Sequence, residues 1–203
     1  MPRRFLFTRE EITAAALALV REKGAQALTA RALGERLGTS AKPVFGLFKN
    51  MEDVRETVIA AAAARLDQLT RAEMTAGRYP PYKASGMAYI RFASEEKELF
   101  KLLYMRDRSQ EAPSEDEREA IRPLLQVIMK NTGLSEERAY LLHAEMWIFV
   151  HGVASMLATS YLNWDMDFAS RALTDAYQGL CARHIEEEKK DGSHQNGQSD
   201  QKV

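Results

Sequence analysis

The chain has 203 residues, of which 45% are hydrophobic and 28% are charged, and its formal net charge at pH 7 is −1. These values are ordinary for a soluble globular protein with a sizeable core in one or two domains. The single cysteine, Cys181, excludes an intrachain disulfide and a cysteine-based metal site. The N-terminal apolar segment is too short for a signal peptide, and no uninterrupted apolar stretch is long enough to span a membrane. We therefore expect a cytoplasmic protein without a membrane partner.

The small net charge hides an asymmetry between the two parts of the chain. Residues 1–50 carry a net charge of +5, whereas the remaining residues carry −6. A basic N-terminal module on an acidic body is the pattern expected when a nucleic-acid-reading domain is joined to a domain with another task.

Residues 1–7 are predicted to form a flexible basic arm. Its Arg3 and Arg4 could follow a DNA backbone or enter a minor groove, and a solvated tail fits the sequence equally well. Thr8 and Glu11 form a capping box that begins a helix with one apolar face, and Gly24 ends that helix. This helix is expected to brace the motif that follows.

Residues 28–54 are predicted to contain two short helices joined by a glycine turn. Thr29 caps the first of these helices. Gly34 permits the two helices to approach closely, and Gly38 suits the left-handed conformation that ends a helix. This arrangement is a helix-turn-helix motif.

The second helix of the motif is predicted to begin after Ser40, with Pro43 in its first turn, where no intrahelical N–H is lost. Val44 and Phe48 lie four residues apart and pack back on the first helix. Such a second helix is presented to a DNA major groove, where Lys42 is the long donor suited to a guanine edge. The residues assigned to DNA contact are Arg3, Arg4, Thr29, Thr39, Ser40, Ala41, Lys42, Pro43, Phe45 and Lys49.

The rest of the chain is also predicted to be helical, which gives an all-α fold of about nine helices. The helix over 135–161 is apolar nearly all round, so it must be buried on several sides, within its domain or against a second subunit. Residues 107–118 are predicted to form a loop and residues 189–203 a disordered tail. The other predicted helices cover residues 51–74, 82–105 (interrupted near Lys97), 116–132 and 166–188.

The order of glycines, caps and apolar residues over residues 8–55 resembles the DNA-binding domain of tetracycline-repressor (TetR) family regulators. The resemblance implies a three-helix DNA-binding domain, placed at residues 1–50, which binds a double-stranded DNA operator. It also implies a larger helical domain, placed at residues 51–188, which holds a small-molecule effector and forms a homodimer through its last two helices. The residues that carry the resemblance are Gly24, Leu28, Thr29, Leu33 to Gly38, Ser40, Val44, Phe45 and Phe48 to Asn50.

Three positions depart from the family pattern. Phe45 stands where the family usually has a phosphate-binding Tyr, Leu47 where it often has Tyr or His, and Met51 where it usually has Lys. Phosphate contacts supply much of the affinity for DNA, so these losses predict weaker or differently organised binding.

In the second half, the run Trp147 to Gly152 (WIFVHG) resembles a signature of the Trp-His-Gly subgroup of TetR C-terminal domains. Soft methionine and aromatic side chains suit an apolar or aromatic effector, although core or interface packing would account for them as well. His143 and His151 are too far apart in sequence for a tight i, i+4 chelate, so neither a metal nor a cofactor is expected. The resemblance implies a ligand cavity bordered by Met87, Phe92, Phe100, Tyr104, His143, Trp147 and His151.

Together these features predict a transcriptional regulator, most simply a repressor released from a palindromic operator by a small apolar or aromatic ligand. Phe45, Leu47 and Met51 leave one alternative open, a ligand-binding helical dimer that acts through a protein partner. An enzyme is the weakest alternative, because the sequence contains no recognisable catalytic constellation.

Overall fold

The computed structural model describes residues 7–107, 109 and 117–199, and within them it contains helices and no strands. The all-α prediction is therefore confirmed. The eight α-helices of the described residues are α1 (Arg9–Lys23), α2 (Ala30–Arg36), α3 (Met51–Ala76), α4 (Pro81–Glu95), α5 (Lys97–Tyr104), α6 (Glu117–Thr132), α7 (Glu136–Ala158) and α8 (Met166–Ser199). Two short 3-10 helices, η1 (Ala25–Ala27) and η2 (Val44–Gly46), flank α2.

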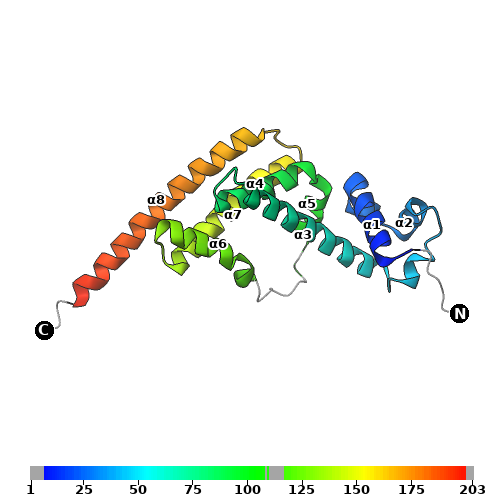
Figure 1. The fold of residues 1–203 in the computed structure, drawn as a ribbon, viewed down its shortest axis with the longest axis horizontal. Helices are drawn as coiled ribbons and strands as arrows, with labels where there is room; N and C mark the ends of the chain where they lie inside the picture. Colours follow the sequence, from blue (N-terminus) through cyan, green and yellow to red (C-terminus); the bar gives the residue numbers. More distant parts are fainter. Residues whose placement is uncertain (1–6, 108, 110–116, 200–203) are drawn as a thin grey trace.

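The molecule is elongated, with α1 and α2 at one end and the C-terminus of α8 at the other (Figure 1). The long helix α3 runs from the α1–α2 end into the body of the molecule (Figure 1). One apolar core joins the two parts, because Ile12 and Val20 of α1 belong to the same buried cluster as Val58 of α3 and Phe100 of α5.

A second apolar core holds the body together. It contains Met87 of α4, Ile128 of α6, Leu142 of α7 and Leu173 of α8. Helix α7 is long and apolar enough to cross a membrane by length and composition alone, as core helices of soluble proteins can also be. It is only partly buried in this chain, and Leu141, Trp147, Ile148 and Met156 are its exposed large apolar side chains.

The local signals for helix starts are confirmed. The Thr8 hydroxyl accepts a hydrogen bond from the N–H of Glu11, whose side chain bonds back to the Thr8 N–H. Thr29, Asn50 and Ser135 cap α2, α3 and α7 in the same way with their side-chain oxygens.

One predicted helix is wrong in form. The second helix of the motif, expected after Ser40, is reduced to bends and the single turn η2, so eight α-helices stand where nine were predicted. The backbone bonds from Val44 to Ala41, from Gly46 to Pro43 and from Leu47 to Val44 span three residues, which is the 3-10 pattern. A segment this short, with a glycine at its centre, cannot offset the cost of starting an α-helix.

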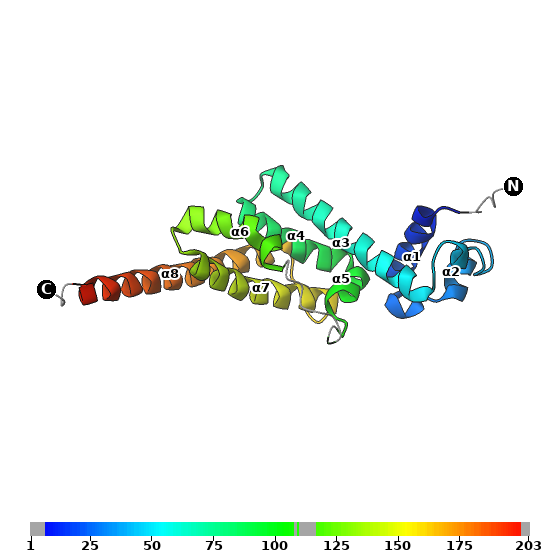
Figure 2. The ribbon, with the colours of Figure 1, turned by 90° about the horizontal axis from the view of Figure 1, so that it is seen from below.

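The disordered tail predicted for residues 189–203 is corrected over residues 189–199, and residues 200–203 lie outside the described residues. Helix α8 was expected to end at residue 188 and instead continues to Ser199, beyond the ends of α6 and α7 (Figure 2). Arg138 of α7 pairs with Asp191 of α8, and Lys190 pairs with Glu186 one turn away at 2.7 Å. These ion pairs favour the continued helix. Part of the predicted loop, at residue 108 and residues 110–116, lies outside the described residues.

Candidate DNA-binding surface and ligand-binding cluster

Two glycines shape the helix-turn-helix region. A Cβ on Gly34 would lie 2.9 Å from the Ala41 backbone nitrogen and 3.0 Å from the Thr39 carbonyl oxygen. Gly38 has φ = +68°, in the left-handed region. The turn predicted from Gly38 is therefore confirmed. The close approach at Gly34 is made by the backbone of residues 39–41 in the segment after α2, and not by a second α-helix as predicted.

Among the predicted DNA-contacting residues that the structure describes, Thr29 is the N-cap of α2 and the others lie on the segment that follows α2, at the end of the molecule opposite the α8 terminus (Figure 1). Arg3 and Arg4 lie outside the described residues. The side chain of Phe45 is 46% exposed, so an apolar ring lies on this surface. Thr29, Ser40, Lys42 and Lys49 are exposed, whereas Thr39, Ala41 and Pro43 are half-buried.

The other two departures from the family pattern have a packing role. Leu47 and Met51 are half-buried and pack against the apolar core that contains Val44 and Phe48. Their apolar side chains therefore stabilise the loop instead of presenting donors to phosphate.

Arg9 was not identified from the sequence as part of this region. Its guanidinium donates to the Leu47 carbonyl at 2.9 Å and to Asp53 Oδ1 at 2.6 Å, and it lies 4.1 Å above the centre of the Phe48 ring. The backbone N–H of Lys49 and then Arg9 lower the pKa of Asp53. This network ties α1, the loop and the start of α3 together. Arg9 is about forty residues away from Leu47 and Asp53 in the sequence, so no local sequence pattern predicts the network.

The second candidate site is a group of rings that we call the aromatic cluster: Tyr89, Phe100, Tyr104, Trp147 and His151. Trp147 stacks on His151, with ring centroids 5.0 Å apart. The Tyr89 hydroxyl and Nδ1 of His151 are 2.9 Å apart, within hydrogen-bond distance. Phe100 is fully buried and Trp147 is 48% exposed, so the cluster leads from the core to the surface.

The aromatic cluster is uncharged near neutral pH. Burial lowers the pKa of His151 and raises the pKa of the Tyr89 hydroxyl, so both side chains are kept neutral. The cluster therefore offers ring faces and one polar pair, which are the features that bind a neutral apolar or aromatic molecule.

The structure brings together four of the seven predicted ligand residues: Phe100, Tyr104, Trp147 and His151. Tyr89 joins them through the bond to His151, although it was singled out only as part of the subgroup pattern. His143 instead lies 3.1 Å from the Tyr82 hydroxyl, and burial lowers its pKa. Met87 and Phe92 are buried core residues.

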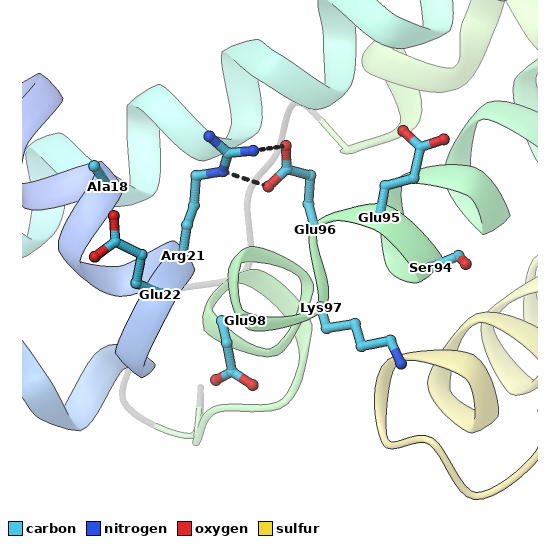
Figure 3. A pocket seen from close by; sticks show the side chains of 8 residues that line it. All are labelled: Ala18, Arg21, Glu22, Ser94, Glu95, Glu96, Lys97 and Glu98. Atoms are coloured by element: carbon cyan, nitrogen blue, oxygen red, sulfur yellow. Dashed lines mark hydrogen bonds and ion pairs between the residues drawn. The ribbon is translucent and has the colours of Figure 1, made fainter.

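A polar cleft of about 600 Å³ lies where α1 approaches α5 (Figure 3). Arg21 of α1 and Glu96, between α4 and α5, point toward each other in this cleft and are joined by two hydrogen bonds (Figure 3). Among the described residues, no group of three or more His, Cys, Asp or Glu side chains could hold a metal ion.

Apolar side chains remain exposed along α7 and at the start of α8. Ile148 is 66% exposed and is the most exposed of the large apolar side chains on α7. Leu141, Met156 and, on α8, Phe168 are exposed as well. The predicted dimer-forming helices thus carry an apolar face that this chain alone does not cover.

Comparisons with known proteins agree with these features. Residues 12–58 match the model of bacterial regulatory proteins of the tetR family. Residues 82–177 match the model described as tetracyclin repressor-like, C-terminal domain. No curated protein is significantly similar to the chain in sequence.

Solved structures with the same fold include the following two. A TetR family protein from Vibrio parahaemolyticus is 20% identical with a TM-score of 0.60, over 84% of this chain and 96% of that one. A TetR variant from Acinetobacter baumannii AYE in complex with minocycline is 18% identical with a TM-score of 0.59, over 88% and 98% of the two chains.

Proposed function

The chain belongs to the TetR family of transcriptional regulators, and from this premise we propose that it is a repressor released from a palindromic operator by a small apolar or aromatic molecule. The observation that carries the proposal is the presence, in one chain, of an exposed helix-turn-helix surface and an uncharged aromatic cluster open to solvent through Trp147. The family model alone implies DNA binding, ligand binding and dimerisation, and it excludes an enzyme.

The proposed operator-binding residues are those predicted from the sequence. Ser40, Lys42 and Lys49 are exposed on the loop that follows α2. Lys42 would donate to a guanine edge, and Lys49 would contact the phosphate backbone. We keep the proposed boundary of this domain at residue 50, just before α3 begins at Met51.

The proposed effector site is the aromatic cluster. A flat apolar molecule would gain stacking against Trp147 and a polar contact with the Tyr89–His151 pair. The fold neighbour in complex with minocycline supports a small-molecule ligand, without identifying the one that this chain binds.

The proposed dimer forms through α7 and α8. Ile148, Leu141 and Met156 of α7 are exposed apolar residues that a second subunit would cover. A four-helix bundle of two α7–α8 pairs would place two reading surfaces on one operator. These surfaces would have to match the distance of about 34–36 Å between successive major grooves on one side of DNA. Effector binding would favour a dimer whose reading surfaces no longer match this spacing. The cytoplasm is the compartment where such an operator is accessible.

The first experiment is selection of bound fragments from a random DNA pool by the purified protein at moderate salt, followed by sequencing. Enrichment of a palindrome supports the proposed operator-binding dimer. Absence of enrichment, with the protein folded and dimeric, contradicts it. That result would favour the second candidate, a ligand-binding dimer that acts through a protein partner, for which the exposed Phe45 is the specific observation.

A further inference from the structure

We infer that Glu96 is a positioning residue that sets the orientation of the reading domain on the body, and thereby the half-site spacing that the dimer accepts. This inference rests on the proposed operator-binding function. It concerns a residue in the polar cleft between α1 and α5, outside both the DNA-binding surface and the aromatic cluster.

Glu96 joins the two parts of the molecule with well-defined geometry. One carboxylate oxygen accepts from Arg21 Nε at 2.6 Å, and the other accepts from Arg21 Nη2 at 2.8 Å (Figure 3). The second oxygen also accepts from Arg65 Nε at 2.7 Å. The Glu96 side chain is only 7% exposed, so these charged bonds are partly shielded from water.

The two arginines come from different parts of the fold. Arg21 lies in the last turn of α1, within the proposed DNA-binding domain. Arg65 lies midway along α3 and anchors Glu96 within the body. Removal of Arg21 therefore removes the bond between the reading domain and Glu96, while the Glu96 carboxylate keeps Arg65 as a cationic partner. This reduces the cost of an unpaired buried charge.

The orientation of the reading domain needs a directional contact. The apolar core shared by α1 and α5 holds the two parts together through burial, which is itself non-directional, and through the fit of its packed side chains. A bidentate bond between arginine and carboxylate adds geometric specificity. A second close contact between the two parts lies at Gly24, where an added Cβ would be 2.8 Å from Glu98 Oε2.

Helix α5 connects this contact to the aromatic cluster. It begins at Lys97, directly after Glu96, and it carries Phe100 and Tyr104, which lie 5.8 and 6.0 Å from His151 between ring centroids. One short helix thus has the Arg21–Glu96 pair at its start and ligand-cluster rings along its length. A shift of α5 changes both sites together.

The test uses the half-site obtained from the wild-type selection. A second DNA pool contains two inverted copies of this half-site, separated by spacers of graded length, and enrichment is measured for each spacer. The wild type is expected to enrich a narrow range of spacers. Arg21→Ala and Glu96→Gln are expected to enrich a broader range and to lose about tenfold in affinity at the wild-type optimum, since a charge-assisted bond is lost. Base preference within the half-site should stay unchanged.

The matched control is Arg71→Ala, which removes an arginine–carboxylate pair with Asp67 that lies wholly on α3. It should give the wild-type spacer profile. An Arg21→Ala profile identical to the wild type overturns the inference, and so does a loss of half-site preference, which indicates a damaged reading domain. If Arg21→Ala does not fold, Arg21→Lys keeps the charge without the bidentate geometry, and the same outcomes apply. Failure of the wild type to enrich any palindrome instead overturns the proposed function, and with it the premise.

Discussion

The indole of Trp147 lies nearly parallel to the imidazole of His151, with 17° between the ring planes and 5.0 Å between their centroids. This pair occupies the solvent side of the aromatic cluster, and His151 also contacts the hydroxyl of the half-buried Tyr89. The indole therefore reports on the protonation of His151 and on anything that enters the cluster.

We predict a pH-dependent fluorescence change of Trp147 with its midpoint below pH 6.5. Burial lowers the pKa of His151, so the imidazole is neutral at pH 7 and gains its proton only at more acidic pH. A protonated imidazole stacked on an indole quenches its emission. The measurement is a pH titration of Trp164→Phe, which leaves Trp147 as the sole tryptophan. His151→Asn should abolish the transition, and His143→Asn should retain it. A midpoint at or above pH 6.5 would contradict the lowered pKa of the half-buried His151 imidazole.

The same pKa direction predicts lower stability in acid. Because His143 and His151 have lower pKa values in the folded protein, the unfolded chain binds more protons. The free energy of unfolding should therefore fall as pH decreases below about 6.5, until the folded-state pKa values are reached. Chemical denaturation at graded pH measures this. The double variant His143→Asn with His151→Asn should show a flatter dependence over that interval. If the double variant shows an equally steep dependence, titratable groups other than these two histidines cause the loss of stability.

Lys42→Ala should weaken operator binding and relax the preference for one base. Lys42 is the exposed long donor at the start of the turn after Ser40, and a side-chain contact with a guanine edge contributes about 1–3 kcal/mol. Quantitative binding to the selected operator and to its single-base variants measures both effects. Lys130→Ala, which removes an exposed lysine from α6, is the control and should bind as the wild type does. Unchanged affinity of Lys42→Ala for cognate DNA would remove Lys42 from the interface.

Gly34→Ala should destabilise the DNA-binding domain by about 1–3 kcal/mol, because the added methyl group forces the backbone of residues 39–41 away from α2. Thermal and chemical unfolding give the free energy difference. Glu35→Ala changes the neighbouring exposed residue, removes only a surface pair with Arg31, and should have little effect. Equal stability of Gly34→Ala and the wild type would show that the loop moves at no cost.

Ile148→Glu should convert the proposed dimer to monomers. The side chain is 66% exposed in the single chain and lies between Leu141 and Met156 in the sequence of α7, and a carboxylate there would be desolvated by a partner subunit. Sedimentation or light scattering over a range of concentrations measures the assembly state. Gln126→Glu adds the same charge to an exposed position on α6 and should remain dimeric. A dimeric Ile148→Glu would move the interface to another face.

The sequence determined those features that depend on neighbours a few residues apart. The capping side chains of Thr8, Thr29, Asn50 and Ser135, the left-handed Gly38 and the break before Lys97 all come from such local chemistry. The resemblance to the TetR family also follows from the sequence, because the glycines, caps and apolar residues of its motif stand at fixed spacings over residues 8–55.

Only the tertiary structure decided which distant side chains meet. The Arg21–Glu96 bond joins residues 75 positions apart, and the packing of α4 on α7 decides that His143 meets Tyr82 while His151 meets Tyr89. The second motif helix is a single 3-10 turn, and α8 continues past residue 188 with the support of Arg138. The Arg21–Glu96 bond, the histidine partners and the continued α8 depend on packing and ion pairs between elements, which no local pattern in the sequence encodes. The 3-10 turn has a local cause instead, because its short glycine-containing segment cannot offset the cost of starting an α-helix.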